Sequence, residues 1–166
     1  MNGNCVIVAD NGRARFFRLA DVEFPELESG PNLEEINDLV NPEREAAGDE
    51  IWSDIKSGRN RGNGGAPAHG YDDHRDQHED EFDRRFARTI AAEAERLANG
   101  STRELVVVAQ KRALGLLRNE LAALGKRGVR IRELAKDLSK LSPIELQDHL
   151  ARLNLIPPRR MRSAQA

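Results

Sequence analysis

The apolar positions near the start of the chain fall in short runs, as expected for β-strands. Residues 4–10 (NCVIVAD) are rich in β-branched side chains and predict a buried strand. Asn11-Gly12 follows, a pair typical of two-residue hairpins because both positions tolerate positive φ. Residues 13–20 (RARFFRLA) predict the returning strand. Residues 33–40 (LEEINDLV) fit helical spacing better than alternation, yet we expect a third strand, because two strands alone form a marginally stable sheet.

From about His78 the apolar residues recur every three or four positions. This stripe predicts a long helix from about His78 to Asn99, with acidic residues in its first turn as the helix dipole favours. The members of the stripe are Phe82, Phe86, Ile90, Ala94 and Leu97.

The last third of the chain alternates strand and helix patterns. Residues 104–109 (ELVVVA) predict a strand covered on both faces, residues 112–124 predict a helix, and residues 129–134 (VRIREL) predict a strand with one exposed face. Ser142-Pro143-Ile144-Glu145 is a capping box with proline at the first helical position, and it predicts a final helix to about Leu153.

These patterns give the order β-β-β-α-β-α-β-α, which predicts an α/β domain with a mixed sheet and helices on its faces. Ribonuclease-H-like domains use this order. We expect a single domain over residues 1–156, with a flexible glycine-rich insertion at about residues 41–77. Residues 57–70 (SGRNRGNGGAPAHG) hold five glycines and one proline. Residues 157–166 are expected to form a loose, basic tail.

Composition narrows the class of protein. The chain has 166 residues, 39% hydrophobic and 33% charged, and no apolar run approaches the roughly 18–20 residues that cross a bilayer. No basic segment leads into an apolar one at the N-terminus, so we expect a cytoplasmic protein that has no membrane partner. Cys5 is the one cysteine, which excludes an intrachain disulfide and a multi-cysteine zinc site. We expect no cofactor.

The net charge of −2 hides a strong asymmetry. Residues 1–100 hold 12 basic and 22 acidic side chains, whereas residues 101–166 hold 14 basic and 6 acidic ones. A basic half indicates a polyanion such as RNA as partner, and the alternative is that the two halves pair with each other in the fold.

The candidate phosphate-binding residues lie at two places. Arg84, Arg85 and Arg88 stand beside the apolar stripe of the long helix, and Lys111 and Arg112 stand at a predicted helix N-terminus, where free N–H groups attract anions. Residues 111–136 carry eight basic and two acidic side chains. Phosphates require only such a positive surface, although 4% aromatic residues leave few platforms for stacking bases.

Three catalytic or metal sites are weaker alternatives. His74 and His78 have the spacing of paired metal ligands if the helix begins early, but no complete metal-binding motif surrounds them. A solvated acidic helix start, which also suits the helix dipole, is the favoured interpretation. Asp10 could serve a two-metal nuclease, although its place before Asn-Gly is explained by turn chemistry. Cys5 is expected in the core, and no serine lies in a nucleophile setting. We therefore expect no enzyme.

Four segments together resemble the bacterial host attachment protein family: residues 6–18 (VIVADNGRARFFR), 78–95 (HEDEFDRRFARTIAAEAE), 104–118 (ELVVVAQKRALGLLR) and 133–150 (ELAKDLSKLSPIELQDHL). That family is similar to the central domain of class-one release factors and of Pelota. The resemblance implies that fold and a ribosome-facing or tRNA-facing ancestry. Gly64, Gly65 and Ala66 would then correspond to the Gly-Gly-Gln loop of release factors. Alanine in place of glutamine counts against peptidyl-tRNA hydrolysis, because the water-positioning group is absent.

Three functions stay open at this point. The first is a non-catalytic module that binds ribosomal or other structured RNA, and the second is a regulatory factor with a protein partner that affects attachment indirectly. The third is a hydrolase, either metal-dependent or acting on peptidyl-tRNA. The oligomeric state does not follow from the sequence.

Overall fold

The computed structural model describes residues 3–10, 12–42 and 69–161, with the backbone alone at residues 69–80 and 82. Within these residues, five strands form one mixed sheet in the order β3-β2-β1-β4-β5. The strands are β1 (Asn4–Ala9), β2 (Arg13–Ala20), β3 (Asn32–Val40), β4 (Glu104–Ala109) and β5 (Arg130–Ala135). The neighbours β1–β2 and β2–β3 are antiparallel, whereas β1–β4 and β4–β5 are parallel.

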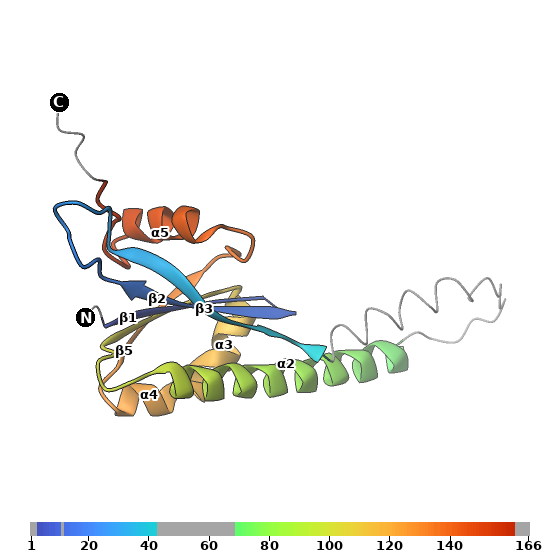
Figure 1. Cartoon of the computed structure of the whole chain (residues 1–166). Coiled ribbons are helices and arrows are strands. Elements are labelled where there is room, and N and C mark those ends of the chain that lie inside the picture. The colour runs from blue at the N-terminus through green and yellow to red at the C-terminus, as the bar shows by residue number, and fades with distance from the viewer. Residues whose placement is uncertain (1–2, 11, 43–68, 162–166) are drawn as a thin grey trace.

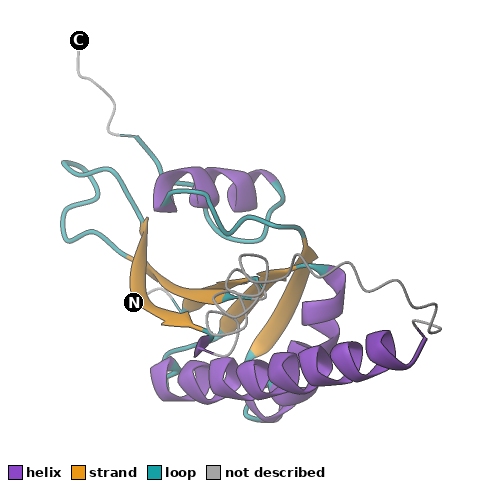
Figure 2. Ribbon diagram, turned by 90° about the vertical axis from the view of Figure 1, so that its right-hand side faces the viewer, coloured by secondary structure: helices purple, strands orange, loops and turns teal. Residues whose placement is uncertain are grey.

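Helices cover both faces of the sheet (Figures 1 and 2). One face carries α2 (His69–Leu97), α3 (Lys111–Glu120) and α4 (Ala122–Lys126), and the other carries α5 (Pro143–Arg152). Successive residues of the central strands alternate between two cores: Ile7 and Val107 face α2 and α3, while Val6 and Val106 face α5. The expected α/β fold with a mixed sheet is thereby confirmed.

The third strand is confirmed, and a β-bulge explains its helix-like spacing. Phe16 pairs with Asn37 and Phe17 with Glu35, so that Ile36 is an extra residue in β3. An extra residue reverses which face the following side chains occupy. Leu33 therefore packs in the core under α5, while Ile36 and Leu39 pack in the core under α2.

Helix α2 begins at His69, so the predicted start at about His78 was wrong. The prediction relied on the apolar stripe, which begins only at Phe82. The preceding turns lack proline and are rich in acidic residues, which stabilise a helix N-terminus without an apolar face. Residues 69–77 of the expected insertion belong to α2, and residues 43–68 lie outside the described part.

The later elements follow the predictions closely. The helix expected over residues 112–124 is divided into α3 and α4 at Leu121, and Gly128 then turns the chain toward β5 with a φ of 93°. The capping box of α5 is confirmed: Glu145 N–H donates to Ser142 Oγ (3.3 Å), and Ser142 N–H donates to Glu145 Oε2 (3.4 Å).

The chain after α5 returns to the loop between β2 and β3. Gly30 and Arg160 exchange two backbone hydrogen bonds, of 3.1 and 3.0 Å. The sequence predicted a loose tail from residue 157. These two hydrogen bonds instead connect the segment 157–161 to the loop before β3. Residues 162–166 lie outside the described part. No helix that the structure describes is both long and apolar enough to span a membrane.

Candidate phosphate-binding face

The start of α3 combines features that attract anions. Helix α3 follows β4 directly at Gln110, whose side chain does not cap it, and its first turn holds no acidic residue. The first helical N–H groups therefore carry the positive end of the helix dipole, next to Lys111 and Arg112. This turn lies beyond the carboxyl ends of the parallel strands β1 and β4, where open α/β sheets commonly bind ligands.

The packing of α2 against α3 brings the predicted arginines near this helix start. Arg84, Arg85 and Arg88 are exposed on α2. Two ion pairs connect the helices: Arg112 to Asp83 (3.7 Å) and Arg88 to Glu120 (3.7 Å). Sequence reasoning proposed the five cations, and the fold places them on two helices that pack together. The exposed surface of these two helices around the five cations is here called the α2–α3 face.

Acidic side chains partly neutralise this face. Arg85 lies 3.6 Å from Glu81, so, among the described side chains, three of the five predicted cations have a carboxylate within ion-pair distance. These distances exceed the 2.9 Å between Arg118 and Glu133. The side chains of Arg85 and Arg88 are more than half exposed, and such surface pairs contribute only about 0–1 kcal/mol. Arg84 and Lys111 are exposed and have no carboxylate partner among the side chains that the structure describes.

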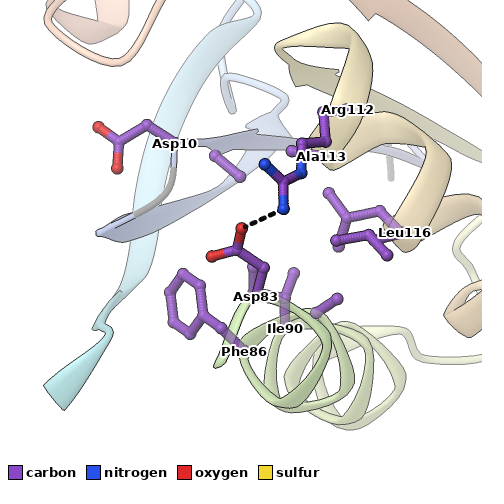
Figure 3. A pocket seen from close by; sticks show the side chains of 10 residues that line it. Asp10, Asp83, Phe86, Ile90, Arg112, Ala113 and Leu116 are labelled. Atoms are coloured by element: carbon purple, nitrogen blue, oxygen red, sulfur yellow. Dashed lines mark ion pairs between the residues drawn. The ribbon is translucent and has the colours of Figure 1, made fainter. Parts of the chain in front are cut away.

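A small pocket lies beneath the Arg112–Asp83 pair (Figure 3). Its walls include Phe86, Ile90 and Leu116, and its volume of about 20 Å³ accommodates roughly one water molecule. The Asp83 side chain is 8% exposed, so Arg112 pairs with a largely buried carboxylate. With space for about one water molecule, the pocket is too small for an organic substrate.

Asp10 is held by the turn that follows it. Its Oδ1 accepts hydrogen bonds from the N–H groups of Gly12 (2.8 Å) and Arg13 (2.7 Å). Figure 3 shows its carboxylate pointing away from Asp83 and Arg112. The expectation that turn chemistry explains Asp10 is confirmed.

The other sequence candidates fall partly outside what the structure describes. The backbone of α2 includes His74 and His78, but their side chains are not described, and Gly64, Gly65 and Ala66 lie outside the described residues. Among the described side chains, no group of three or more histidine, cysteine or acidic residues could hold a metal ion.

The basic stretch 111–136 is divided between two ends of the molecule. Lys111 and Arg112 stand at the carboxyl ends of the parallel strands. Because α3 and α4 lead back toward the start of β5, Lys126 and Arg127 stand at the amino ends. The cations of the stretch therefore do not form one surface.

Sequence reasoning missed one buried cation, Arg15 on β2. Its guanidinium donates to both Glu35 carboxylate oxygens (3.0 and 2.9 Å) and to the carbonyls of Ser139 (3.1 Å) and Leu141 (2.6 Å), and it lies 4.9 Å from the centre of the Phe17 ring. The only signal for it was a basic residue among apolar neighbours in 13–20. With its donors occupied by protein, Arg15 ties β2 and β3 to the chain before α5.

The fold and the α2–α3 face define a mixed α/β protein with exposed cations around a helix start. The model of one family, described as "Protein required for attachment to host cells", matches residues 5–150, and the chain belongs to this family. A search of curated proteins found no match.

Proposed function

We propose that the protein binds phosphate groups of structured RNA, ribosomal RNA first, through the α2–α3 face. The observation that carries this proposal is the start of α3, where an uncapped helix N-terminus and two cations meet the exposed arginines of α2. Neighbouring phosphates along an RNA backbone would contact the exposed Arg84 and Lys111 first.

The ion pairs of the face are compatible with phosphate binding. Arg85 and Arg88 each keep a long, exposed contact to a carboxylate. A phosphate offers more charge and more acceptor oxygens than a carboxylate, and the pairs cost little to break. The carboxylates also lower the net charge of the face, so we expect moderate affinity that falls steeply with salt.

The identity of the RNA rests on the family resemblance. The expected resemblance of the family to release-factor central domains would favour ribosomal RNA, and the binding role needs no catalytic group. In this proposal the protein acts in the cytoplasm and affects attachment to host cells indirectly. A regulatory factor that acts on a protein partner is the alternative.

The test compares two double charge reversals that change the net charge equally. Arg84→Glu/Lys111→Glu alters the α2–α3 face, and Lys126→Glu/Arg127→Glu alters the opposite end of the helical layer. Binding to ribosomes is measured by co-sedimentation through sucrose gradients at low and high salt, and binding to a structured RNA by filter binding. We expect the first variant to bind at least about tenfold more weakly and the second to bind like wild type.

Two results would contradict the proposal. Equal losses in both variants would indicate unspecific attraction to the whole basic half. Wild-type protein that stays at the top of the gradient at low salt, and binds no structured RNA, would reject RNA binding. A protein partner recovered after nuclease treatment would then support the regulatory alternative.

A further inference from the structure

A groove lies at the end of the molecule where the loop 21–31 meets the segment 157–161. It has a volume of about 340 Å³ and is lined mainly by apolar side chains, with one acidic and one basic residue. Its lining residues are Asp21, Val22, Pro25, Gly30, Pro31, Pro157, Pro158 and Arg160. In Figure 1 the loop after β2 lies beside the described C-terminal end and far from the N-terminal turns of α2.

The walls of the groove are fixed to each other. Gly30 and Arg160 exchange two backbone hydrogen bonds. The buried amide of Gln147 donates to the carbonyls of Pro31 (2.8 Å) and Pro157 (3.3 Å), one from each wall. The groove is therefore a preformed feature of the fold.

Large apolar side chains project beside the groove. Phe24 and Leu27 are 53% and 63% exposed, and Met161 is 72% exposed. The turn that presents the first two is ordered by bonds from the N–H groups of Leu27 (2.9 Å) and Glu28 (2.8 Å) to the Phe24 carbonyl. Exposed apolar side chains grouped in this way mark an interaction site, because their burial is favourable.

The charges of the two walls are complementary. The loop 21–31 holds four acidic residues and no basic one, whereas the segment 157–161 holds two arginines and no acidic residue. One surface thus combines projecting side chains, a recess, an acidic part and a basic part. A contact between identical surfaces across a two-fold axis requires this self-complementarity.

From this surface we infer that a second copy of the chain docks here, in a two-fold symmetric dimer. Phe24 and Leu27 of each copy enter the groove of the other, and the acidic loop of each faces the exposed Arg160 of the other. The inference does not depend on the proposed RNA binding, because it concerns a different end of the molecule. The contact involves few residues, so we expect a dissociation constant of roughly 1–100 µM.

The experiment is sedimentation velocity of the full chain over about 1 to 300 µM. Wild-type protein should pass from monomer to dimer within this range. Leu27→Asp should remain monomeric throughout, because it places an additional carboxylate in the apolar contact. Ile144→Asp is the matched control, because Ile144 on α5 is 64% exposed and Leu27 is 63% exposed. Ile144 lies away from the groove, so this variant should dimerise like wild type.

A second pair of variants tests the charge complementarity. Arg160→Glu should weaken the dimer at low salt by about tenfold, whereas Lys140→Glu, at an exposed position elsewhere, should not. Circular dichroism and thermal melting verify that each variant is folded.

Several outcomes would overturn the inference. Wild-type protein that is monomeric at all concentrations excludes the dimer. A dimer that persists in folded Leu27→Asp, or is lost in Ile144→Asp, places the contact on another face. Growth beyond a dimer into longer assemblies excludes the two-fold arrangement, since only a closed contact stops at two copies.

Discussion

Gln147 is a buried polar side chain that makes three hydrogen bonds. It lies on α5 and is 1% exposed. Its Oε1 accepts from the N–H group of Leu33 (3.0 Å), and its Nε2 donates to the carbonyls of Pro31 and Pro157. Three segments distant in sequence therefore meet at one amide. Its oxygen provides an acceptor for the N–H group of Leu33 near the start of the edge strand β3.

Replacement of Gln147 by alanine should lower the free energy of unfolding by about 2–4 kcal/mol. The substitution leaves the buried Leu33 N–H without an acceptor and opens a cavity, and both effects destabilise. Urea denaturation measures the loss, with Gln110→Ala as the control, because Gln110 is exposed and its side chain does not cap α3. A loss below about 1 kcal/mol would show that water replaces the amide.

Glu93 predicts an acid-sensitive contribution to stability. The Arg96 guanidinium, and then the Asn37 amide (2.6 Å), donate hydrogen bonds to its carboxylate and hold the pKa of Glu93 below its ordinary value. A lowered pKa in the folded state stabilises the protein above the ordinary pKa, and this stabilisation is lost as the pH falls through the folded value. Wild type should therefore be more stable than Glu93→Gln at pH 7, and the difference should shrink between about pH 5 and pH 3.

Urea denaturation of wild type and Glu93→Gln at pH 7 and at pH 3 checks this prediction. Arg96→Met serves as the partner variant in a double-mutant cycle at pH 7. The double variant should lose less stability than the two single variants together, because both remove the same contact. Strict additivity, or a difference that persists unchanged at pH 3, would contradict the role of the pair.

At the scale of the elements, two glycines isolate the effect of backbone conformation. Gly128 between α4 and β5 has a φ of 93°, whereas Gly115 lies inside α3, and neither position has an atom within 4 Å of an added Cβ. Gly128→Ala should cost about 1 kcal/mol, since a side chain rarely adopts this φ. Gly115→Ala should stabilise by up to about 1 kcal/mol, because alanine favours the helix. Thermal unfolding of both variants measures the difference, and shifts of the same sign would contradict the prediction.

The elements themselves could largely be predicted from the sequence, since each has a local pattern. The exceptions have physical causes. The bulge at Ile36 gives β3 the spacing of a helix, and only the marginal stability of a two-stranded sheet favoured a strand there. The N-terminal turns of α2 carry no apolar stripe, so hydrophobic periodicity could not locate His69 as the helix start.

The candidate site could be predicted only in part. Composition and position along the helices identified the five cations of the α2–α3 face. Their partners Asp83 and Glu120 depend on how α2 packs against α3, and no local pattern encodes this packing. The groove joins segments more than a hundred residues apart, and nothing in either segment alone indicates the other.

At the scale of the whole molecule, the acidic and basic halves pair only in part. Arg112 with Asp83 and Arg88 with Glu120 connect the two halves, whereas Arg84 and Lys111 keep their charge exposed. The alternative in which the two halves pair with each other is therefore realised in part, and a polyanion partner stays a prediction.

The two proposals together predict bivalent binding. A dimer joined at the groove would carry two α2–α3 faces, so a long RNA could engage both copies at once and gain about 10²-fold or more in apparent affinity. At concentrations that populate the dimer, Leu27→Asp should bind a long structured RNA at least about tenfold more weakly than wild type, and a short hairpin equally well. Filter binding measures the affinity of wild type and of Leu27→Asp for both RNAs. If the two proteins bound the long RNA with equal affinity, the dimer would bind it through only one of its α2–α3 faces.

The sheet order also determines when the fold can close during synthesis. Strand β1 lies in the middle of the sheet, and one of its neighbours, β4, begins only at Glu104. At roughly 5–20 residues per second, the ribosome releases β1, β2 and β3 some seconds before β4 emerges. During this interval the apolar edge of β1 is open to pairing with another nascent chain. Production of this protein should therefore be limited by how well that edge is shielded while translation continues.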